Sequence, residues 1–356
     1  MKLAPLKIGN LQSKLPIIQG GMGIGVSLSK LAAAVANEGG IGTISGVQIG
    51  FKDPEFETDS EKANIKALKN EIAKAKELAP EGIIAVNLMV ALSNYDDMVK
   101  AAVDGGADII VSGAGIPSRL PELVQGRKCK LIPIVSSGKA AKIICKRWKS
   151  RYNYLPDGII VEGPDAGGHL GFSMDQLIEG GNKDLETIVK ETIEIVRPFE
   201  EEDKKIPIIA AGGIFDGSDI AKFLQLGASG VQMGTRFIAT EECDASKAYK
   251  NEFINCKKGD IQLTQSPVGM PGRAIRNKFL SKISDERKNI SKCYNCLSKC
   301  NPATTLYCIS EALLNAVKGN TKEGLIFTGT NGYKIEKIVS VKELMQHLKR
   351  EVGEGM

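Results

Sequence analysis

Histidine, aromatic residues and long apolar runs are all scarce in this sequence. The 356 residues include two His, one Trp and 5% aromatic residues. No run of about 18 or more apolar residues, the length needed to span a membrane, occurs. The first residues also lack the apolar core and the small-residue cleavage site of a signal peptide. These absences predict a cytoplasmic protein without a membrane partner, and they leave only two imidazoles for chemistry.

Charge of one sign is not in strong excess either. Lys and Arg number 47 against 42 Asp and Glu, a net charge of +5 without a basic stripe. Nucleic acid is therefore not an expected partner. With 42% hydrophobic and 25% charged residues, the composition is that of a globular protein, which excludes collagen, a disordered tail and a small disulfide scaffold.

A short apolar run, a Gly-containing turn and an amphipathic segment recur along the first 255 residues. Runs such as Ile206–Ala211 are apolar throughout, which is typical of parallel strands buried on both faces. The predicted strands are Pro16–Gln19, Ile41–Ser45, Ile83–Leu88, Asp108–Ser112, Leu131–Ser136, Gly158–Glu162, Ile206–Ala211 and Gly230–Gly234. The predicted helices run from a Ser27 or Ser29 cap to Asn37, from a Ser60 cap to Leu78, and over Tyr95–Val103, Lys139–Trp148, Leu185–Val196, Ser218–Leu226 and Val341–Arg350.

Eight such strand and helix units match the size of an α/β fold of the (β/α)8 TIM barrel type. An open doubly wound sheet is the alternative, but the first turn, Gly20–Val26, lacks the G-x-G-x-x-G spacing of that fold. The alternation stops near residue 256. We therefore predict a barrel over residues 1–255 and an appended, helical C-terminal segment over residues 256–356 that carries a Cys cluster.

Glycines gather where the predicted strands end, and this is where such barrels place functional residues. The last two of these turns contain Gly212–Gly213 and Gly234–Thr235–Arg236. Backbone N–H groups after the seventh and eighth strands commonly bind phosphate. A tight turn with positive φ is the structural alternative for one Gly-Gly pair, but two successive turns favour phosphate.

Three polar side chains stand at the same predicted strand ends. His169 lies in the Gly-rich loop Gly167–Gly171, where its imidazole is a candidate general acid or base, whereas His347 lies on a predicted surface helix. Asn87 follows an apolar strand and is a candidate to bond the edge of a heterocycle, with a turn-forming role as the alternative. Glu162 ends the sixth strand.

A C-x2-C-x3-C-x7-C pattern stands out in the C-terminal segment. Its members are Cys293, Cys296, Cys300 and Cys308. This spacing can gather four thiolates around zinc or an iron–sulfur cluster. The alternative is a set of reduced thiols that pack the appended helices. We interpret the isolated Cys129, Cys145, Cys243 and Cys256 as structural.

In combination, the motifs resemble the nitronate monooxygenase (2-nitropropane dioxygenase) family, which also includes FMN-dependent enoyl-acyl carrier protein reductases. They are Pro16–Met22, Gly39–Gly42, Ala166–Gly171, Ala210–Ile214 and Gln232–Phe237, continued weakly by Gly269–Ala274 and Asn277–Phe279. The resemblance implies an FMN-binding barrel with His169 as the catalytic residue. The implied FMN contacts are Gly21, Met22, Asn87, Glu162, Gly167, Gly212, Gly213, Gln232, Met233, Gly234 and Thr235.

The resemblance also implies a reaction, the oxidation of alkyl nitronates with O2. Nitronate monooxygenases often carry Gln where this chain has Glu162, and the reductases carry Glu. An NAD(P)H-dependent reductase of enoyl thioesters is therefore the alternative. The Cys cluster is not part of the family pattern, so a non-catalytic flavin-binding redox sensor is a second alternative. The oligomeric state stays open, with a homodimer among the possibilities.

Overall fold

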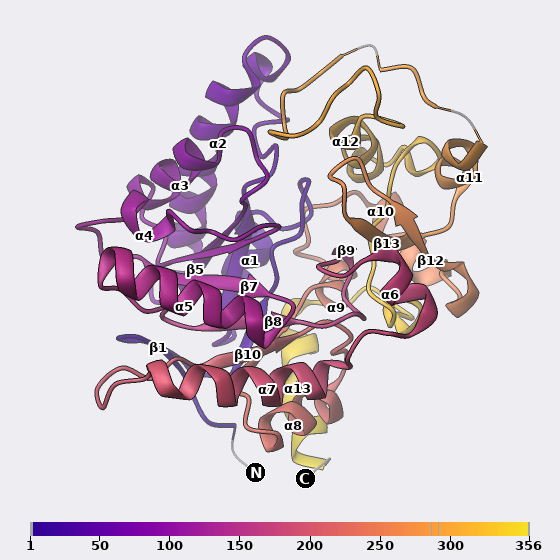
Figure 1. Ribbon diagram of the computed structural model, residues 1–356. Helices are drawn as coiled ribbons and strands as arrows, with labels where there is room; N and C mark the ends of the chain where they lie inside the picture. Colours follow the sequence, from indigo (N-terminus) through magenta and orange to yellow (C-terminus); the bar gives the residue numbers. More distant parts are fainter. Residues whose placement is uncertain (1–2, 286, 291, 355–356) are drawn as a thin grey trace.

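A closed barrel of eight parallel strands forms the centre of the computed structural model, which describes residues 3–285, 287–290 and 292–354 (Figure 1). The barrel runs in sequence order and closes by pairing of the last strand with the first. The strands are β3 (Ile17–Gln19), β4 (Ile41–Ser45), β5 (Ile83–Met89), β6 (Ile109–Gly113), β7 (Lys130–Val135), β8 (Ile159–Glu162), β10 (Ile208–Ala211) and β11 (Gly230–Met233). The predicted TIM barrel and all eight predicted strands are confirmed.

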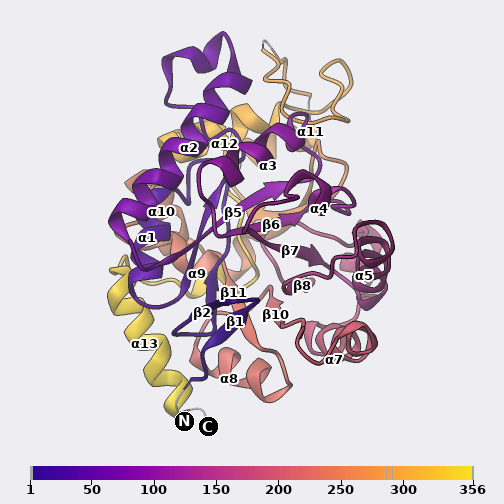
Figure 2. The ribbon, with the colours of Figure 1, turned by 90° about the vertical axis from the view of Figure 1, so that its left-hand side faces the viewer.

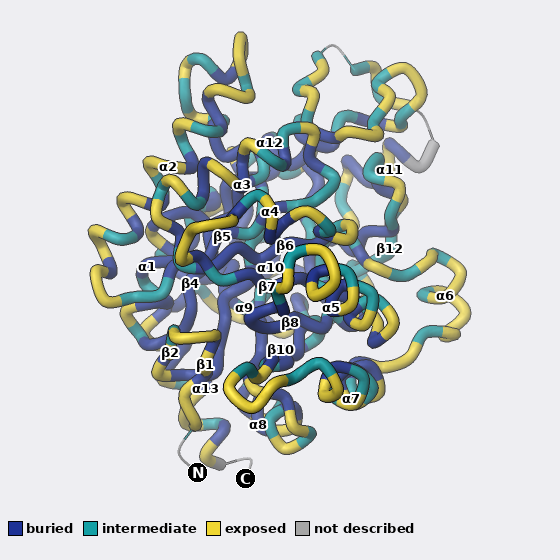
Figure 3. The backbone as a smooth tube through the Cα atoms, turned by 60° about the vertical axis from the view of Figure 1, so that its left-hand side comes forward, coloured by how far each residue is buried: buried dark blue, intermediate teal, exposed yellow. Residues whose placement is uncertain are grey.

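The barrel interior is a packed core of aliphatic side chains. Ile18, Ile41 and Ile109 point inward and are fully buried. The amino end of the barrel is closed by a hairpin that was not predicted, β1 (Leu6–Ile8) and β2 (Leu11–Ser13), because Leu6 and Ile8 join the same core. Figure 3 shows the buried strands at the centre and the exposed residues on the outer helices and loops. The interior is therefore filled, and a ligand has to bind at an end of the barrel.

Helices surround the barrel at the predicted positions. They are α1 (Ser29–Asn37), α2 (Ser60–Leu78), α3 (Tyr95–Asp104), α5 (Gly138–Tyr152), α7 (Leu185–Val196) and α8 (Gly217–Gln225). Four helices were not predicted: α4 (Leu120–Leu123), α6 (Met174–Glu179), α9 (Thr235–Ile238) and α10 (Lys247–Asn255). No helix in the described ranges combines the length and the apolar character that crossing a membrane requires.

The predicted serine caps are wrong. Helix α1 begins after Leu28, whose N–H group donates to Asp244 Oδ2 at 3.0 Å, so a distant carboxylate takes the capping role. Ser27 Oγ accepts the Met22 N–H group instead. Helix α2 is capped by Asp59, whose side chain accepts the Lys62 N–H group. A carboxylate satisfies the free N–H groups of a first turn as well as a hydroxyl does.

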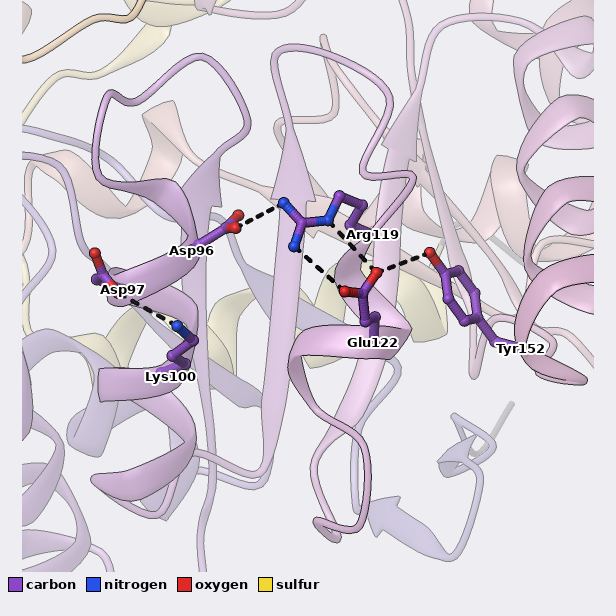
Figure 4. A network of polar contacts seen from close by, with 6 residues as sticks. All are labelled: Asp96, Asp97, Lys100, Arg119, Glu122 and Tyr152. Atoms are coloured by element: carbon purple, nitrogen blue, oxygen red, sulfur yellow. Dashed lines mark hydrogen bonds and ion pairs between the residues drawn. The ribbon is translucent and has the colours of Figure 1, made fainter.

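An exposed polar network joins α3, α4 and α5 on the flank of the barrel (Figure 4). Arg119 donates to Asp96 at 2.9 Å and to Glu122 at 3.3 Å, and the Tyr152 hydroxyl donates to Glu122 at 3.3 Å. Exposed pairs of this kind contribute little stability. The buried Trp148 of α5, which donates to the Pro117 carbonyl, anchors this flank more firmly.

The C-terminal segment packs closely against the barrel. Strands β12 (Ile261–Gln265) and β13 (Pro271–Ile275) form a hairpin, and β13 pairs with the two-residue strand β9 (Gly168–His169). The helices are α11 (Lys278–Asp285), α12 (Ile309–Lys318) and α13 (Val341–Glu354), the last confirming the predicted closing helix. Helix α13 contacts α1 and α8 and so fills the ring of outer helices (Figure 2). The segment thereby completes both the outer layer and the rim around His169.

Candidate functional site

A cavity of about 240 Å³ opens at the carboxyl ends of the barrel strands. It lies where barrels of this type place their active sites. The structure brings together every residue for which the sequence predicts a catalytic or FMN-binding role. The predicted residues that line the cavity are Gly21, Met22, Asn87, Glu162, Gly167, His169, Gly212, Gly213, Gln232, Met233, Gly234 and Thr235.

Glycines shape the walls of this cavity. A Cβ atom on Gly21 would lie 2.3 Å from Cβ of Asn87, so any larger residue would displace the Asn87 side chain. Gly212 and Gly213 adopt φ values of 96° and 82°, which L side chains rarely adopt. The backbone therefore forms part of the wall itself, and a flat ligand can approach it closely.

The two turns predicted to bind phosphate lie side by side, because β10 and β11 are neighbours. Segment 328–331 fixes their backbone: Asn331 Nδ2 donates to the Gly213 carbonyl at 2.6 Å, and the Gly329 N–H group donates to Thr235 Oγ1 at 2.9 Å. Because the Thr235 hydroxyl accepts this bond, its own proton is free for an anion. Arg236 does not line the cavity; its guanidinium lies 4.8 Å from the centroid of the Phe215 ring.

His169 is held by the C-terminal hairpin. Its Nε2 atom lies 2.8 Å from Ser266 Oγ, and its ring meets the edge of Phe327 with 5.0 Å between centroids. Ser266 Oγ accepts the Val268 N–H group at 3.3 Å, which favours the hydroxyl as donor to Nε2. Nδ1 then carries the imidazole proton. Burial lowers the pKa of His169 to about 4, so the ring is neutral near pH 7.

Other polar groups in or near the cavity have no hydrogen-bond partner among the described residues. Burial raises the pKa of Glu162, which lines the cavity, to about 7, so this carboxyl group is partly protonated near neutral pH. Gln232 Oε1 and Thr43 Oγ1 are buried with no hydrogen-bond partner in the described part of the chain. Buried polar atoms are normally paired. Gln232 lines the cavity, so a bound molecule with an N–H donor would satisfy its unpaired oxygen.

Arg273 and Ser266 are functional candidates for which the sequence analysis assigned no role. Arg273 on β13 is 8% exposed, and its Nη1 atom donates to the carbonyls of Pro164 and Ala166, each at 2.6 Å. Arg273 thereby fixes the loop that carries Gly167 and His169. Two signals were available: Arg273 lies in the family-like stretch Gly269–Ala274, and it is a single Arg within the otherwise apolar run Pro271–Ile275. Nothing local marked Ser266, because its partner lies 97 positions away.

The cysteines of the C-terminal pattern are not part of this cavity. Cys293, Cys296, Cys300 and Cys308 line a separate cavity of about 30 Å³. Within the described residues, no group of three or more His, Cys, Asp or Glu side chains is arranged to hold a metal ion. The zinc or cluster site therefore stays a prediction. The four isolated cysteines are buried, as expected of structural thiols.

A larger cavity of about 730 Å³ lies at the opposite end of the barrel, beside the β1 strand and the loop before β10. Three of its charged side chains are paired: Lys205 Nζ lies 3.5 Å from Glu200, and Lys204 Nζ lies 2.8 Å from Asp157. Residues at this end of such barrels serve stability. The smaller cavity is therefore the candidate active site.

Comparisons with known proteins agree with this geometry. The family model described as nitronate monooxygenase matches residues 4–351. A probable nitronate monooxygenase of Staphylococcus saprophyticus is 29% identical over 306 residues, which cover 80% of this chain and 82% of the relative. FabK from Thermotoga maritima is 26% identical with a TM-score of 0.71, over 95% of this chain and 93% of FabK. Nitroalkane oxidase from Streptomyces ansochromogenes, at 21% identity, TM-score 0.74 and coverage of 96% and 97%, shows the shared fold.

Proposed function

The chain belongs to the nitronate monooxygenase family and is an FMN-dependent oxidoreductase, and we propose that it oxidises alkyl nitronates with O2, with His169 as the catalytic residue. The observation that carries this proposal is the position of a neutral imidazole in the wall of the Gly-rich cavity. A neutral imidazole can donate a hydrogen bond from one nitrogen and accept one at the other. Such a group suits a small anionic substrate.

The residues around the cavity fit FMN. The backbone N–H groups at Gly213, Gly234 and Thr235 and the Thr235 hydroxyl would hold the phosphate. The unpaired Gln232 Oε1 would accept an N–H group of the flavin ring. Gly21 lines the cavity with backbone alone, because a Cβ atom there would collide with the Asn87 side chain. When bound, FMN supplies one- and two-electron redox chemistry and reaction with O2.

The protein contributes the position of the proton and the exclusion of water. Ser266 donates to Nε2 of His169, so the Nδ1–H group is the donor that can orient a nitronate oxygen. Phe327 and Leu313, both lining the cavity, keep this end of the site apolar. In apolar surroundings a hydrogen bond to an anion is stronger than in water.

A reductase of enoyl thioesters that uses NAD(P)H is the second candidate, and Glu162 favours it. The enoyl-acyl carrier protein reductases of this family carry Glu at the matching position. In this chain the carboxyl group has a raised pKa of about 7 and lies on the cavity. A carboxyl group with such a pKa can serve as a proton donor near neutral pH.

Anaerobic reduction of the bound flavin distinguishes the two candidates. The purified FMN protein is mixed separately with an alkyl nitronate, NADH and NADPH, and the flavin absorbance is followed. We expect rapid bleaching with the nitronate and no change with either nicotinamide. Rapid reduction by NADH or NADPH alone would overturn the proposal in favour of the reductase, with enoyl thioesters as the next substrates.

A further inference from the structure

Four of the eight cysteines gather in one place, and the proposed reaction does not use them. Cys293, Cys296, Cys300 and Cys308 all line the same cavity of about 30 Å³. Cys293 is exposed, and the other three are partly buried. The remaining four cysteines are buried apart from this cavity. A set of four thiols around one space is the arrangement of a site rather than of core packing.

The four thiols line one space. No three of them are arranged to hold a single metal ion, within the ranges that the structure describes. An iron–sulfur cluster is larger than an ion, because its iron and sulfide atoms lie between the thiolates. It therefore binds thiolates that are further apart than the ligands of one zinc ion. Four Cys without a His is also the usual ligand set of such a cluster.

A backbone N–H group already faces one of these sulfur atoms. The Asn295 N–H group donates to Cys293 Sγ at 3.4 Å, with Asn295 in the left-handed conformation at a φ of 46°. Cys308 stands at the start of the ten-residue helix α12. Hydrogen bonds to the sulfur atoms are a general feature of bound clusters.

The loop between α11 and α12, which carries the four cysteines and is called the cysteine loop below, contacts the rest of the protein through groups other than its thiols. It crosses from α11 towards the start of α2 at the top of the molecule (Figure 1). Tyr294 stacks on Phe56 with 5.4 Å between ring centroids. The Ser93 N–H group donates to the Cys296 carbonyl at 3.3 Å, and the Ser298 N–H group donates to the Ala91 carbonyl at 3.0 Å.

These contacts leave the loop with little regular structure. Between α11 and α12, the described residues contain one isolated bridge, Leu92 with Leu297, and no helix or strand. Long segments without secondary structure inside a compact protein need another source of order. Covalent bonds from four thiolates to a shared cluster would supply it.

From the shared cavity, the C-x2-C-x3-C-x7-C pattern and the N–H donor to Cys293, we infer that Cys293, Cys296, Cys300 and Cys308 bind an iron–sulfur cluster. Its place is beside the loop that follows β5, the strand whose Asn87 and Met89 line the candidate active site. The inference does not depend on the substrate of that site.

The test measures iron and acid-labile sulfide in the full-length protein purified without oxygen. The parent is compared with the Cys293→Ser/Cys296→Ser double variant and with Cys129→Ser, a control in which a buried thiol outside the loop is changed. FMN content is measured in each sample, and electron paramagnetic resonance after dithionite reduction separates the cluster from the flavin. We expect iron and sulfide in parent and control, and background amounts in the double variant with FMN retained.

Several results would overturn the inference. They are zinc without sulfide in the parent, no iron or sulfide after anaerobic reconstitution with ferrous iron and sulfide, or a double variant as rich in iron and sulfide as the parent. If the double variant does not fold, iron, sulfide and FMN are measured in the Cys300→Ser single variant instead and are compared with the parent values. Because these readouts use neither nitronate nor NAD(P)H, failure of the proposed reaction leaves them unaffected.

Discussion

Strand β8 has a carboxyl group near each end, and the two lie in opposite environments. Asp157, just before the amino end, accepts hydrogen bonds from the Leu131 N–H group at 2.9 Å and from Lys204 at 2.8 Å. Glu162, the last residue of the strand, faces the candidate site, and no group in the described residues is bonded to its carboxyl oxygens. Burial raises the Glu162 pKa to about 7. Paired polar groups mark the structural end of the barrel and unpaired ones mark the functional end.

The cavities at the two ends of the barrel differ in the same way as these two carboxyl groups. The amino end has the larger volume, about 730 Å³ against about 240 Å³ at the carboxyl end. Lys204, Lys205 and Glu200 in the larger cavity have ion-pair partners, whereas Gln232 in the wall of the smaller one has an unpaired Oε1 and His169 there is neutral. Groups that lack a partner or have a shifted pKa therefore identify a site better than its size does.

The His169→Ala variant is expected to give the largest effect. Turnover of nitronate should fall by roughly 10²- to 10⁴-fold, because the group that positions the proton is lost. FMN should stay bound, since the turns at Gly213 and Thr235 are unchanged. Oxygen consumption and flavin absorbance measure the two quantities. Lys205→Ala in the opposite cavity is the control and should keep full turnover; an active His169→Ala enzyme would remove the catalytic role.

The Asp157→Asn variant tests whether the amino end of the barrel contributes to stability and not to turnover. The change removes the charge that pairs with Lys204 at a site where Asp157 is 2% exposed, so the free energy of unfolding should fall by about 3 kcal/mol. Turnover at the remote end should stay near that of the parent. Urea unfolding and steady-state kinetics measure both. A large loss of turnover without a loss of stability would contradict the division between the two ends.

Glu162→Gln should change how stability depends on pH. The carboxyl pKa is about 7 in the folded protein against an ordinary value of 4.5, so the folded state binds more protons between these values. Relative to the variant, the parent should therefore lose stability as pH rises from about 4.5 to about 7, by up to about 3 kcal/mol. The variant lacks this contribution, while His169, whose lowered pKa acts in the opposite sense, is present in both. Urea unfolding of the FMN-free proteins across this range is the measurement, and parallel curves would refute the assignment.

Ser266→Ala tests the orientation of the imidazole. Loss of the hydroxyl that bonds Nε2 at 2.8 Å should lower kcat by about three- to tenfold with little change in KM. A role in folding alone would lower the amount of folded protein and leave kcat per bound FMN unchanged. Ser266→Thr keeps the hydroxyl and should restore the parent kcat, and failure of this rescue would weaken the positioning role.

Arg119→Ala should give the smallest effect, because it lies on the flank between the two ends. Its partners Asp96 and Glu122 are solvent-exposed (Figure 4), and exposed pairs contribute little. We expect the urea midpoint and the turnover to match those of the parent. A clear shift of either would mean that the flank is coupled to the barrel ends.

The barrel strands were predictable from the sequence because parallel strands buried on both faces are continuous apolar runs. Ile206–Ala211 is an example, and it contains β10. The helix caps were not predictable in the same way. The carboxylate that caps α1 belongs to Asp244, 216 positions from Leu28, so no local spacing announces it.

Some residues of the candidate site were likewise predictable from the sequence, whereas their partners were not. The Gly-rich turns can be recognised in the sequence because glycines recur at the ends of the predicted strands. His169 can be recognised because it is one of only two histidines and lies in such a turn. The partners of these residues do not stand out. Strand β9 has two residues and forms through pairing with β13 more than 100 positions later. Arg273 and Ser266 acquire their roles only through that pairing.

The sequence by itself determined the barrel, the face on which the site lies and the Gly-rich turns in its wall, because hydrophobic periodicity and glycine turns act over short stretches of chain. Only the tertiary structure decided which carboxyl group is paired, which side chains surround His169 and that the four thiols line one cavity. Those properties depend on burial and on hydrogen bonds between residues far apart in the chain. Neither burial nor such hydrogen bonds can be predicted from a short stretch of sequence.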